Sequence, residues 1–339
     1  MFCIPLHYTC RRDTVGIKDD LSRKYFQDPA RFADVFNFTL YEGEKIIDPR
    51  GLKEMDTSEI FISKGKKSIQ RTRDVFKSAV IFESDECYYA LLGLELQSHI
   101  DYTMPLRDML QNAMGYVRQL ERFSARHKQD KDLTGDAFLC GFSKEDRLKP
   151  IISVVLYLGT GTWDGAVTLH DMLGRIDRRV LEKVPDYGIN LVTPDTVQDF
   201  SRFHTSFGLV YEMFKYANNE QELEKLLRKK SGDYANISDD DIDMIRTFLK
   251  IDLQRDKEDE VVEVCKAWDD HYESGRRKGM KTGMKTGMKK GIKKGIYKGQ
   301  RNTLCRLVSK GLISEEQAAA ELNMSPEKFR QIRMSVPVK

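Results

Sequence analysis

Residues 73–97, RDVFKSAVIFESDECYYALLGLELQ, decide the fold. Two runs within this segment, 73–82 and 88–97, are rich in aromatic and aliphatic residues and predict β-strands. The polar residues 83–86 between them form a connection of hairpin length. The segment therefore favours two neighbouring strands that run in opposite directions.

The regions on either side predict helices and one further strand. Residues 27–40, QDPARFADVFNFTL, form a helix with Asp28 as its cap and Pro29 in the first turn. A second helix covers 105–126, and an apolar strand covers 150–158. This order predicts an α/β core with one βαβ-type connection.

The chain becomes helical from about residue 194. Three helices are predicted at 197–216, 220–230 and 239–272. The last begins with the acidic run 238–241, SDDD, which either caps the helix or binds a metal ion. We favour the cap, because consecutive acids on a first helical turn point in different directions around the axis.

The positive charge is concentrated near the C-terminus. Residues 275–301 hold eleven Lys and Arg and no acid. Subtracting these from the net charge of +3 leaves −8 on the rest of the chain. A basic tail on an acidic body indicates either a polyanionic partner or a solvated linker.

The same basic segment carries a glycine at every fourth position from 275 to 299. Seven glycines at about 1 kcal/mol each make an isolated helix marginal. The segment predicts a helix that is ordered by self-association or by a phosphate backbone, and that frays otherwise. Residues 302–339 then predict short helices, with Gly311 ending one and Ser314 and Pro326 opening the next two, in helix-turn-helix proportions.

Composition also bears on location. The longest apolar runs, such as 151–158, are too short to span a bilayer, so no membrane partner is expected. The six cysteines are scattered without a C-x-x-C pair. This indicates free thiols in a reducing cytoplasm.

Polar residues lie where the two predicted strands meet. Asp74 starts the first strand, and Glu95 and Gln97, which share one face, end the second. If the strands are antiparallel, Asp74 lies beside Glu95, and two carboxylates there would form a hard-oxygen site for Mg²⁺. Acid pairs on neighbouring strands are also common without any catalytic role.

Several short motifs together resemble one known family. They are RDV (73–75), GLELQS (93–98), DYTMPLR (101–107), PIISVVLYLG (150–159), WDG (163–165), FADVFN (32–37) and the glycine-repeat tail. With them the chain resembles the recombination-promoting nuclease (Rpn)/transposase-like family, most fully over residues 27–200. The family is assigned to the PD-(D/E)XK superfamily of nucleases, whose αβββαβ core agrees with the order of elements above.

The resemblance implies a metal-dependent endodeoxyribonuclease that uses Mg²⁺, or Mn²⁺ in its place. Asp74 corresponds to the first catalytic acid. Glu95-x-Gln97 stands where the superfamily usually has (D/E)-x-K, and Asp74 and Glu95 would bind the metal ion. Asp34, on the first helix, falls where related nucleases often have an additional acid and would be a further metal ligand.

The resemblance also implies residues that contact DNA. Arg107, in the catalytic set, would supply the positive charge that Gln97 lacks, because glutamine only forms hydrogen bonds. Tyr116, on the same helix, would face the substrate phosphate. The basic tail would bind the DNA backbone through Lys281, Lys285, Lys289, Lys290, Lys293 and Lys294.

Two other functions remain open. One is a DNA-binding protein whose nuclease fold has lost its activity. The other is a scaffold that self-assembles through the glycine repeat. Whichever function holds, we expect the chain to form a homo-oligomer through this tail. The expected organisation is an N-terminal arm (1–26), a nuclease-like domain (27–200), a helical region (201–274), a basic glycine-repeat helix or linker (275–301) and a helix-turn-helix-like unit (302–339).

Overall fold

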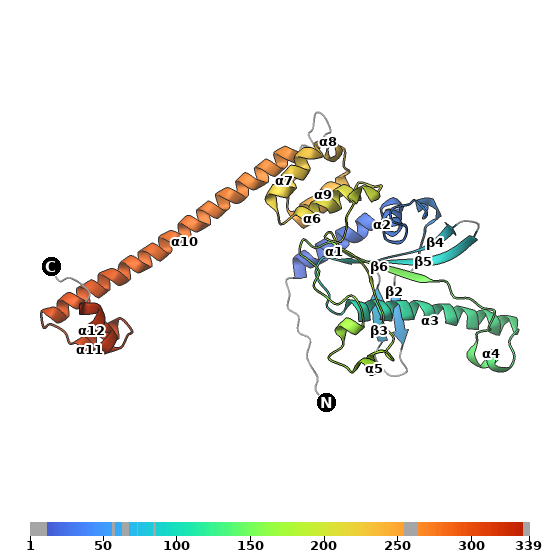
Figure 1. The fold of residues 1–339 in the computed structure, drawn as a ribbon, viewed down its shortest axis with the longest axis horizontal. Coiled ribbons are helices and arrows are strands. Elements are labelled where there is room, and N and C mark those ends of the chain that lie inside the picture. Colours follow the sequence, from blue (N-terminus) through green and yellow to red (C-terminus); the bar gives the residue numbers. More distant parts are fainter. Residues whose placement is uncertain are drawn as a thin grey trace. The chain divides into compact units, whose positions relative to one another are not determined.

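Antiparallel pairing of two long strands forms the centre of the fold (Figure 1). The structure is a computed structural model that describes residues 12–55, 58–62, 68–72, 74–83, 86–253 and 264–334. Its strands are β1 (Lys53–Glu54), β2 (Ser58–Ile62), β3 (Ser68–Thr72), β4 (Val75–Glu83), β5 (Glu86–Gln97), β6 (Ile151–Tyr157) and β7 (Asn190–Val192). Five of them form a sheet in the order β1-β4-β5-β6-β7, and β2 pairs with β3.

The register of the sheet agrees with the predicted strand pair. β4 and β5 are antiparallel, with Val75 opposite Leu94 and Glu83 opposite Glu86. β6 adds parallel to β5, and β7 adds parallel to β6. Position 73 and the centre of the predicted connection, 84–85, lie outside the described residues.

Helices make up most of the remaining structure. They are α1 (Arg12–Gln27), α2 (Pro29–Tyr41), α3 (Met104–Asp130), α4 (Gly135–Cys140), α5 (Arg178–Leu181), α6 (Phe207–Tyr216), α7 (Glu220–Lys229), α8 (Ser231–Tyr234), α9 (Asp239–Leu249), α10 (Val264–Ser309), α11 (Glu315–Glu321) and α12 (Pro326–Met334), with the 3-10 helices η1 (Pro49–Gly51), η2 (His170–Met172) and η3 (Phe200–Arg202). The cap of α2 is as predicted. The side chain of Asp28 accepts hydrogen bonds from the N–H groups of Ala30 and Arg31.

Helices cover both faces of the sheet (Figure 1). The main core lies between one face and the layer of α1, α2, α6 and α9, and it includes Val75 and Leu94. The opposite face carries a small cluster of Phe76, Leu91 and Ile151, against which Tyr116 of α3 packs. Successive strand residues therefore point to opposite faces of the sheet. The five-stranded sheet with helices on both faces confirms a mixed α/β fold.

The chain divides into two units, Met1–Trp268 and Asp269–Lys339, and this differs from the expected domain boundaries. Phe26, from the expected N-terminal arm, lies 5.0 Å from Phe207, from the expected helical region, between ring centroids. Both rings are fully buried. The aromatic core thus joins segments that the sequence analysis separated, although residues 1–11 lie outside the described part.

The acidic run before α9 caps that helix. Ser238 and Asp241 form a reciprocal capping box, and Asp241 is fully buried. Arg31 contacts Asp241 at 3.8 Å and Ser238 at 2.9 Å. The prediction of a capped helix start is therefore confirmed.

The prediction of one helix from 239 to 272 is wrong, because Lys250 adopts a left-handed conformation (φ 62°) that ends α9.

The second unit contains the glycine repeat and two short helices. The repeat is helical throughout as part of α10, whereas we expected fraying without a partner. The predicted short helices are present: Gly311 has φ 69°, Ser314 forms a capping box with Gln317, and Pro326 begins α12. Buried Cys305 and Phe329 belong to the core that joins α10, α11 and α12. Among the described residues, every helix is too short or too polar to span a bilayer.

Candidate carboxylate site

Asp74 and Glu95 lie at the same end of the sheet. Val75 is opposite Leu94, so Asp74, just before Val75, and Glu95, just after Leu94, are neighbours across the antiparallel pair. The Oδ2 atom of Asp74 accepts a hydrogen bond of 2.9 Å from the backbone N–H of Leu96. This bond fixes the Asp74 carboxylate against β5, next to Glu95.

Two arginines compensate the charge of these acids. Nη2 of Arg107, on α3, lies 2.9 Å from Oε2 of Glu95, which is fully buried. Nη2 of Arg23, on α1, lies 3.3 Å from Oδ1 of Asp74, which is 15% exposed. Burial lowers the pKa of Arg107, but the charges of Glu95, Asp74 and Asp101 outweigh this effect and raise it. Asp74 and Glu95 therefore both act on a single guanidinium group.

A third acid, Asp19 of α1, belongs to this site and was missed by the sequence analysis. Its Oδ1 accepts a hydrogen bond of 3.4 Å from Oγ of Ser98, which directly follows β5. Burial, and then the nearby charge of Asp74, raise the pKa of Asp19. The spacing of Leu21, Tyr25 and Phe26 was the available signal, since it indicates a helix with one buried face.

Gln97 lies on the same strand face as Glu95 and is nearly buried, with 9% of its surface exposed. It pairs with Tyr157 of β6, and its backbone carbonyl accepts a hydrogen bond of 2.8 Å from the N–H of Leu158. Two parallel strands thus end together at this edge. Catalytic and binding sites of α/β proteins commonly lie at the carboxyl ends of parallel strands.

Asp34 does not share a site with Asp74 and Glu95. Its carboxylate accepts hydrogen bonds from the N–H of His204 at 2.8 Å and from the N–H and Oγ1 of Thr205 at 2.8 and 2.6 Å. Asp34 is 3% exposed and lies on α2, on the main-core side of the sheet. Its geometry is that of a buried acceptor that holds the segment before α6, and not of a ligand shared with Asp74 and Glu95.

Tyr116 is not at the site either. It lies nine residues beyond Arg107 on α3, which corresponds to about 13 Å along the helix axis. Its hydroxyl accepts a hydrogen bond of 3.2 Å from the N–H of Ile151, at the opposite end of β6 from Tyr157. The six predicted DNA-binding lysines are exposed on α10, in the second unit.

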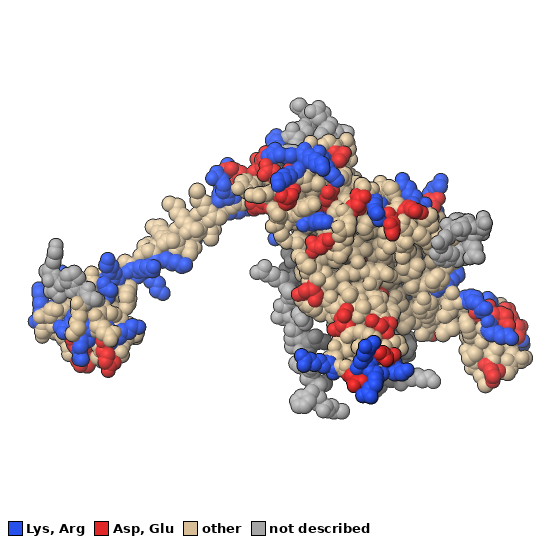
Figure 2. Space-filling model, viewed as in Figure 1, with Lys and Arg blue, Asp and Glu red and all other residues tan. Residues whose placement is uncertain are grey.

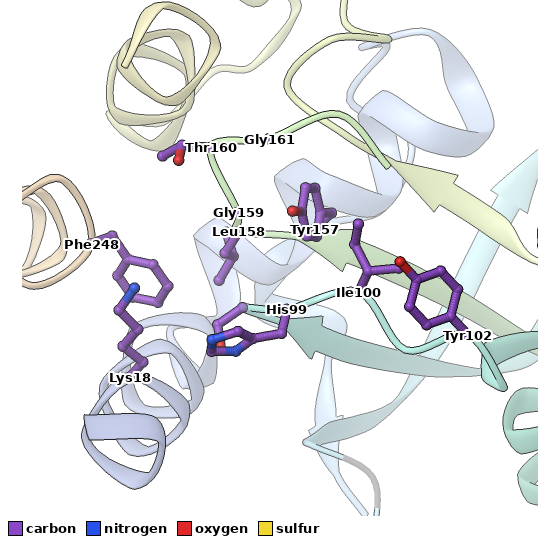
Figure 3. Close-up of a pocket in the computed structure, with 11 residues that line it drawn as sticks. Lys18, His99, Ile100, Tyr102, Tyr157, Leu158, Gly159, Thr160, Gly161 and Phe248 are labelled. Atoms are coloured by element: carbon purple, nitrogen blue, oxygen red, sulfur yellow. The ribbon is translucent and has the colours of Figure 1, made fainter. Parts of the chain in front are cut away.

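A cavity of about 430 Å³ lies at the carboxyl ends of β5 and β6 (Figure 3). It begins where β5 and β6 end, and α1 and the end of α9 complete its wall. The residues that line it are Lys18, Ser98, His99, Ile100, Tyr102, Tyr157, Leu158, Gly159, Thr160, Gly161 and Phe248. Ser98 joins the two regions, because it lines the cavity and donates its hydrogen bond to Asp19.

The donor atoms at this site suit a divalent cation such as Mg²⁺. Mg²⁺ prefers oxygen ligands, and it is commonly held by one or two carboxylates together with water and substrate phosphate. Asp74 and Glu95 provide two carboxylates from adjacent backbone positions. No group of three or more His, Cys, Asp or Glu side chains suited to a metal ion occurs in the part of the chain that the structure describes.

Comparison with known proteins adds no relative. No family model, no curated protein and no solved structure matches the chain. The family resemblance rests on the short motifs of residues 27–200 and on the glycine-repeat tail.

The contacts of Asp34 predict a structural role. Asp34→Ala leaves the N–H groups of His204 and Thr205 without their acceptor, so it should lower the free energy of unfolding by about 3 kcal/mol in chemical denaturation. Asp28→Ala is the control, since loss of this exposed helix cap costs about 1 kcal/mol. If Asp34→Ala instead left stability unchanged and abolished divalent-metal binding, Asp34 would be a ligand.

Proposed function

We propose that the larger unit is a metal-dependent DNA endonuclease of the recombination-promoting nuclease type, with a core of the PD-(D/E)XK αβββαβ kind. The main support is the β4–β5 register, which makes Asp74 and Glu95 neighbours at the end of the sheet where β5 and β6 both end. The proposed reaction is hydrolysis of a phosphodiester bond.

Asp74 and Glu95 would hold Mg²⁺ or Mn²⁺. When bound, such an ion lowers the pKa of water and neutralises negative charge on the phosphate. Arg107, whose guanidinium pairs with Glu95, would bind a phosphate oxygen of the substrate. Arg23 positions the carboxylate of Asp74 from α1.

Gln97 would orient water or a phosphate oxygen by hydrogen bonding, since its amide carries no charge. In a superfamily that usually has lysine at this position, the missing positive charge must come from elsewhere. Arg107 is suitable because its guanidinium already lies within reach of Glu95, on the same face of β5.

The main alternative is a DNA-binding protein without nuclease activity. One observation favours it: Glu95 is fully buried and paired with Arg107 at 2.9 Å. A buried ion pair of this kind can be purely structural, because removing either partner leaves an uncompensated charge. The two functions differ in whether the protein cleaves DNA when a divalent metal ion is added.

Cleavage of supercoiled plasmid DNA separates these functions. Asp74→Ala should lower Mg²⁺-dependent nicking by about a hundredfold or more, because it removes one metal ligand. Glu95→Gln, which keeps the shape of the side chain beside Arg107, should have a similar effect, and EDTA should stop nicking by the wild type. Glu121→Ala, which changes an exposed acid of α3, is the control. Equal nicking by wild type, Asp74→Ala and Glu95→Gln would refute the nuclease.

A cytoplasmic location is part of this proposal. Cys140 and Cys305, the cysteines for which the structure describes the side chain, are both free thiols. Free thiols are typical of proteins in reducing compartments.

The glycine repeat of α10 would add DNA affinity that does not depend on sequence. Its lysines are exposed, and Figure 2 shows Lys and Arg on this part of the helix without acidic neighbours. Neutralisation of phosphates by such side chains releases counterions, so the affinity falls as salt concentration rises. This term comes from the second unit and needs no nuclease activity.

The salt dependence of DNA binding tests the role of the repeat. The triple variant Lys281→Gln, Lys285→Gln and Lys289→Gln should reduce the slope of log K against log salt by about 3, and deletion of 275–339 should reduce it further. The control neutralises three exposed lysines of the larger unit, Lys128, Lys131 and Lys144. Equal slopes for both triple variants would show that the repeat does not bind DNA.

The same helix has an apolar face that suits a second copy of the chain. Between 52% and 76% of the surface of Met280, Met284, Met288, Ile292 and Ile296 is exposed. Each follows a glycine, and glycine rows allow helix backbones to approach closely. Burying this row between two copies would remove it from water and offset the low helix propensity of glycine.

Light scattering without DNA tests this self-association. The double variant Met284→Lys and Met288→Lys should lower the measured mass to that of the monomer, because paired helices would then bury charges. Met334→Lys, at a 78% exposed position on α12, is the control and should keep the mass of the wild type. An oligomer that survives both the double variant and deletion of 275–339 would require another interface.

A further inference from the structure

In the cavity at the carboxyl ends of β5 and β6, the wall that α1 forms carries one positive charge, on Lys18. Lys18 of α1 lines it, and its Nζ lies 4.7 Å from the ring centroid of Phe248. Lys250 follows at the end of α9, close enough for its charge to lower the pKa of Lys18, although burial is the larger cause. The charge of Asp19, the next residue on α1, acts in the opposite direction and raises the pKa of Lys18, while its carboxylate accepts the Ser98 hydrogen bond. This wall is suited to an anion.

The rest of the cavity is rich in rings, as Figure 3 shows. His99 and Tyr102, on the loop between β5 and α3, are exposed, and 61% of the surface of Tyr102 is accessible. The hydroxyl of Tyr102 donates a hydrogen bond of 3.0 Å to Asp164, which holds the ring in place. Tyr157 is nearly buried, and a Cβ atom at position 159 would lie 2.2 Å from its ring, so the chain needs glycine there.

A basic wall opposite ring faces matches the two parts of a nucleotide. A lysine binds phosphate as a point charge, and a base stacks on an aromatic ring irrespective of its identity. The volume of about 430 Å³ lies in the range of small-molecule sites. The cavity also adjoins the acids, because Ser98 lines it while it contacts Asp19.

We propose that this cavity binds one unpaired nucleotide of the DNA strand, with its phosphate on Lys18 and its base against Tyr102. The proposal deepens the nuclease function and rests on it for the position of the strand. A base inside a duplex is stacked on both sides and cannot reach the ring. The favoured substrates are thus DNAs with an unpaired nucleotide next to the bond to be cut.

Binding of two DNA probes in EDTA tests this inference without any cleavage. Both are short duplexes with one 2-aminopurine, which is unpaired in the first probe and paired with thymine in the second. The wild type should bind the unpaired probe at least about tenfold more tightly and change its fluorescence. Tyr102→Ala should weaken that binding about tenfold, the worth of one base–ring stack, and Tyr102→Phe should retain it. Lys18→Ala should lower the salt slope by about one.

The matched control is a lysine–tyrosine pair at the other end of β5. Lys149 lies 4.7 Å from the ring centroid of Tyr89, which is 55% exposed, so Tyr89→Ala and Lys149→Ala remove the same groups elsewhere. Equal affinity for both probes, or equal losses from the Tyr102 and Tyr89 variants, would overturn the proposal. If the predicted binding is found but the wild type does not nick plasmid, the nucleotide site stands and the nuclease fails.

Discussion

The register between β4 and β5 is the constraint on which the rest of the larger unit depends. It continues without interruption from Val75 opposite Leu94 to Glu83 opposite Glu86. A slip of one residue would turn every side chain of a strand to the opposite face. Glu95 would then enter the main core, and Leu94 would face α3. The buried apolar residues of both faces therefore fix the position of the carboxylates, and the site is a product of core packing.

Charge compensation follows from that position. A carboxylate as buried as Glu95 is stable only with a charged or hydrogen-bonding partner, and α3 begins close enough to β5 for Arg107 to provide one. α1 provides Arg23 for Asp74 and also brings Asp19 to the same group. Helices on both sides of the sheet thus contribute charged side chains to the group around Asp74 and Glu95. The packing of α1 and α3 on the sheet therefore determines which charges surround these two carboxylates.

Elements with strong periodicity, and the adjacency that follows from them, are predictable from the sequence. The β4–β5 pair, α3, β6 and the caps at Asp28 and Ser238 were predicted because each has a local signal in neighbouring residues. Asp19 was missed because its role depends on α1 packing across the end of the sheet. Asp34 and Tyr116 were placed by resemblance alone, and their partners, Thr205 and Ile151, are distant in sequence. Local patterns do not encode such contacts.

The glycine rows of α10 have a mechanical consequence. A Cβ atom added at any of the seven positions from Gly275 to Gly299 would meet nothing within 4 Å, so alanine fits at each. An alanine version of the helix would be more stable by about 7 kcal/mol at about 1 kcal/mol per site. That difference is concentrated in one stretch of backbone, where opening a turn costs less than in an ordinary helix. The repeat is therefore a helix that bends and opens more easily than an alanine-rich helix of the same length.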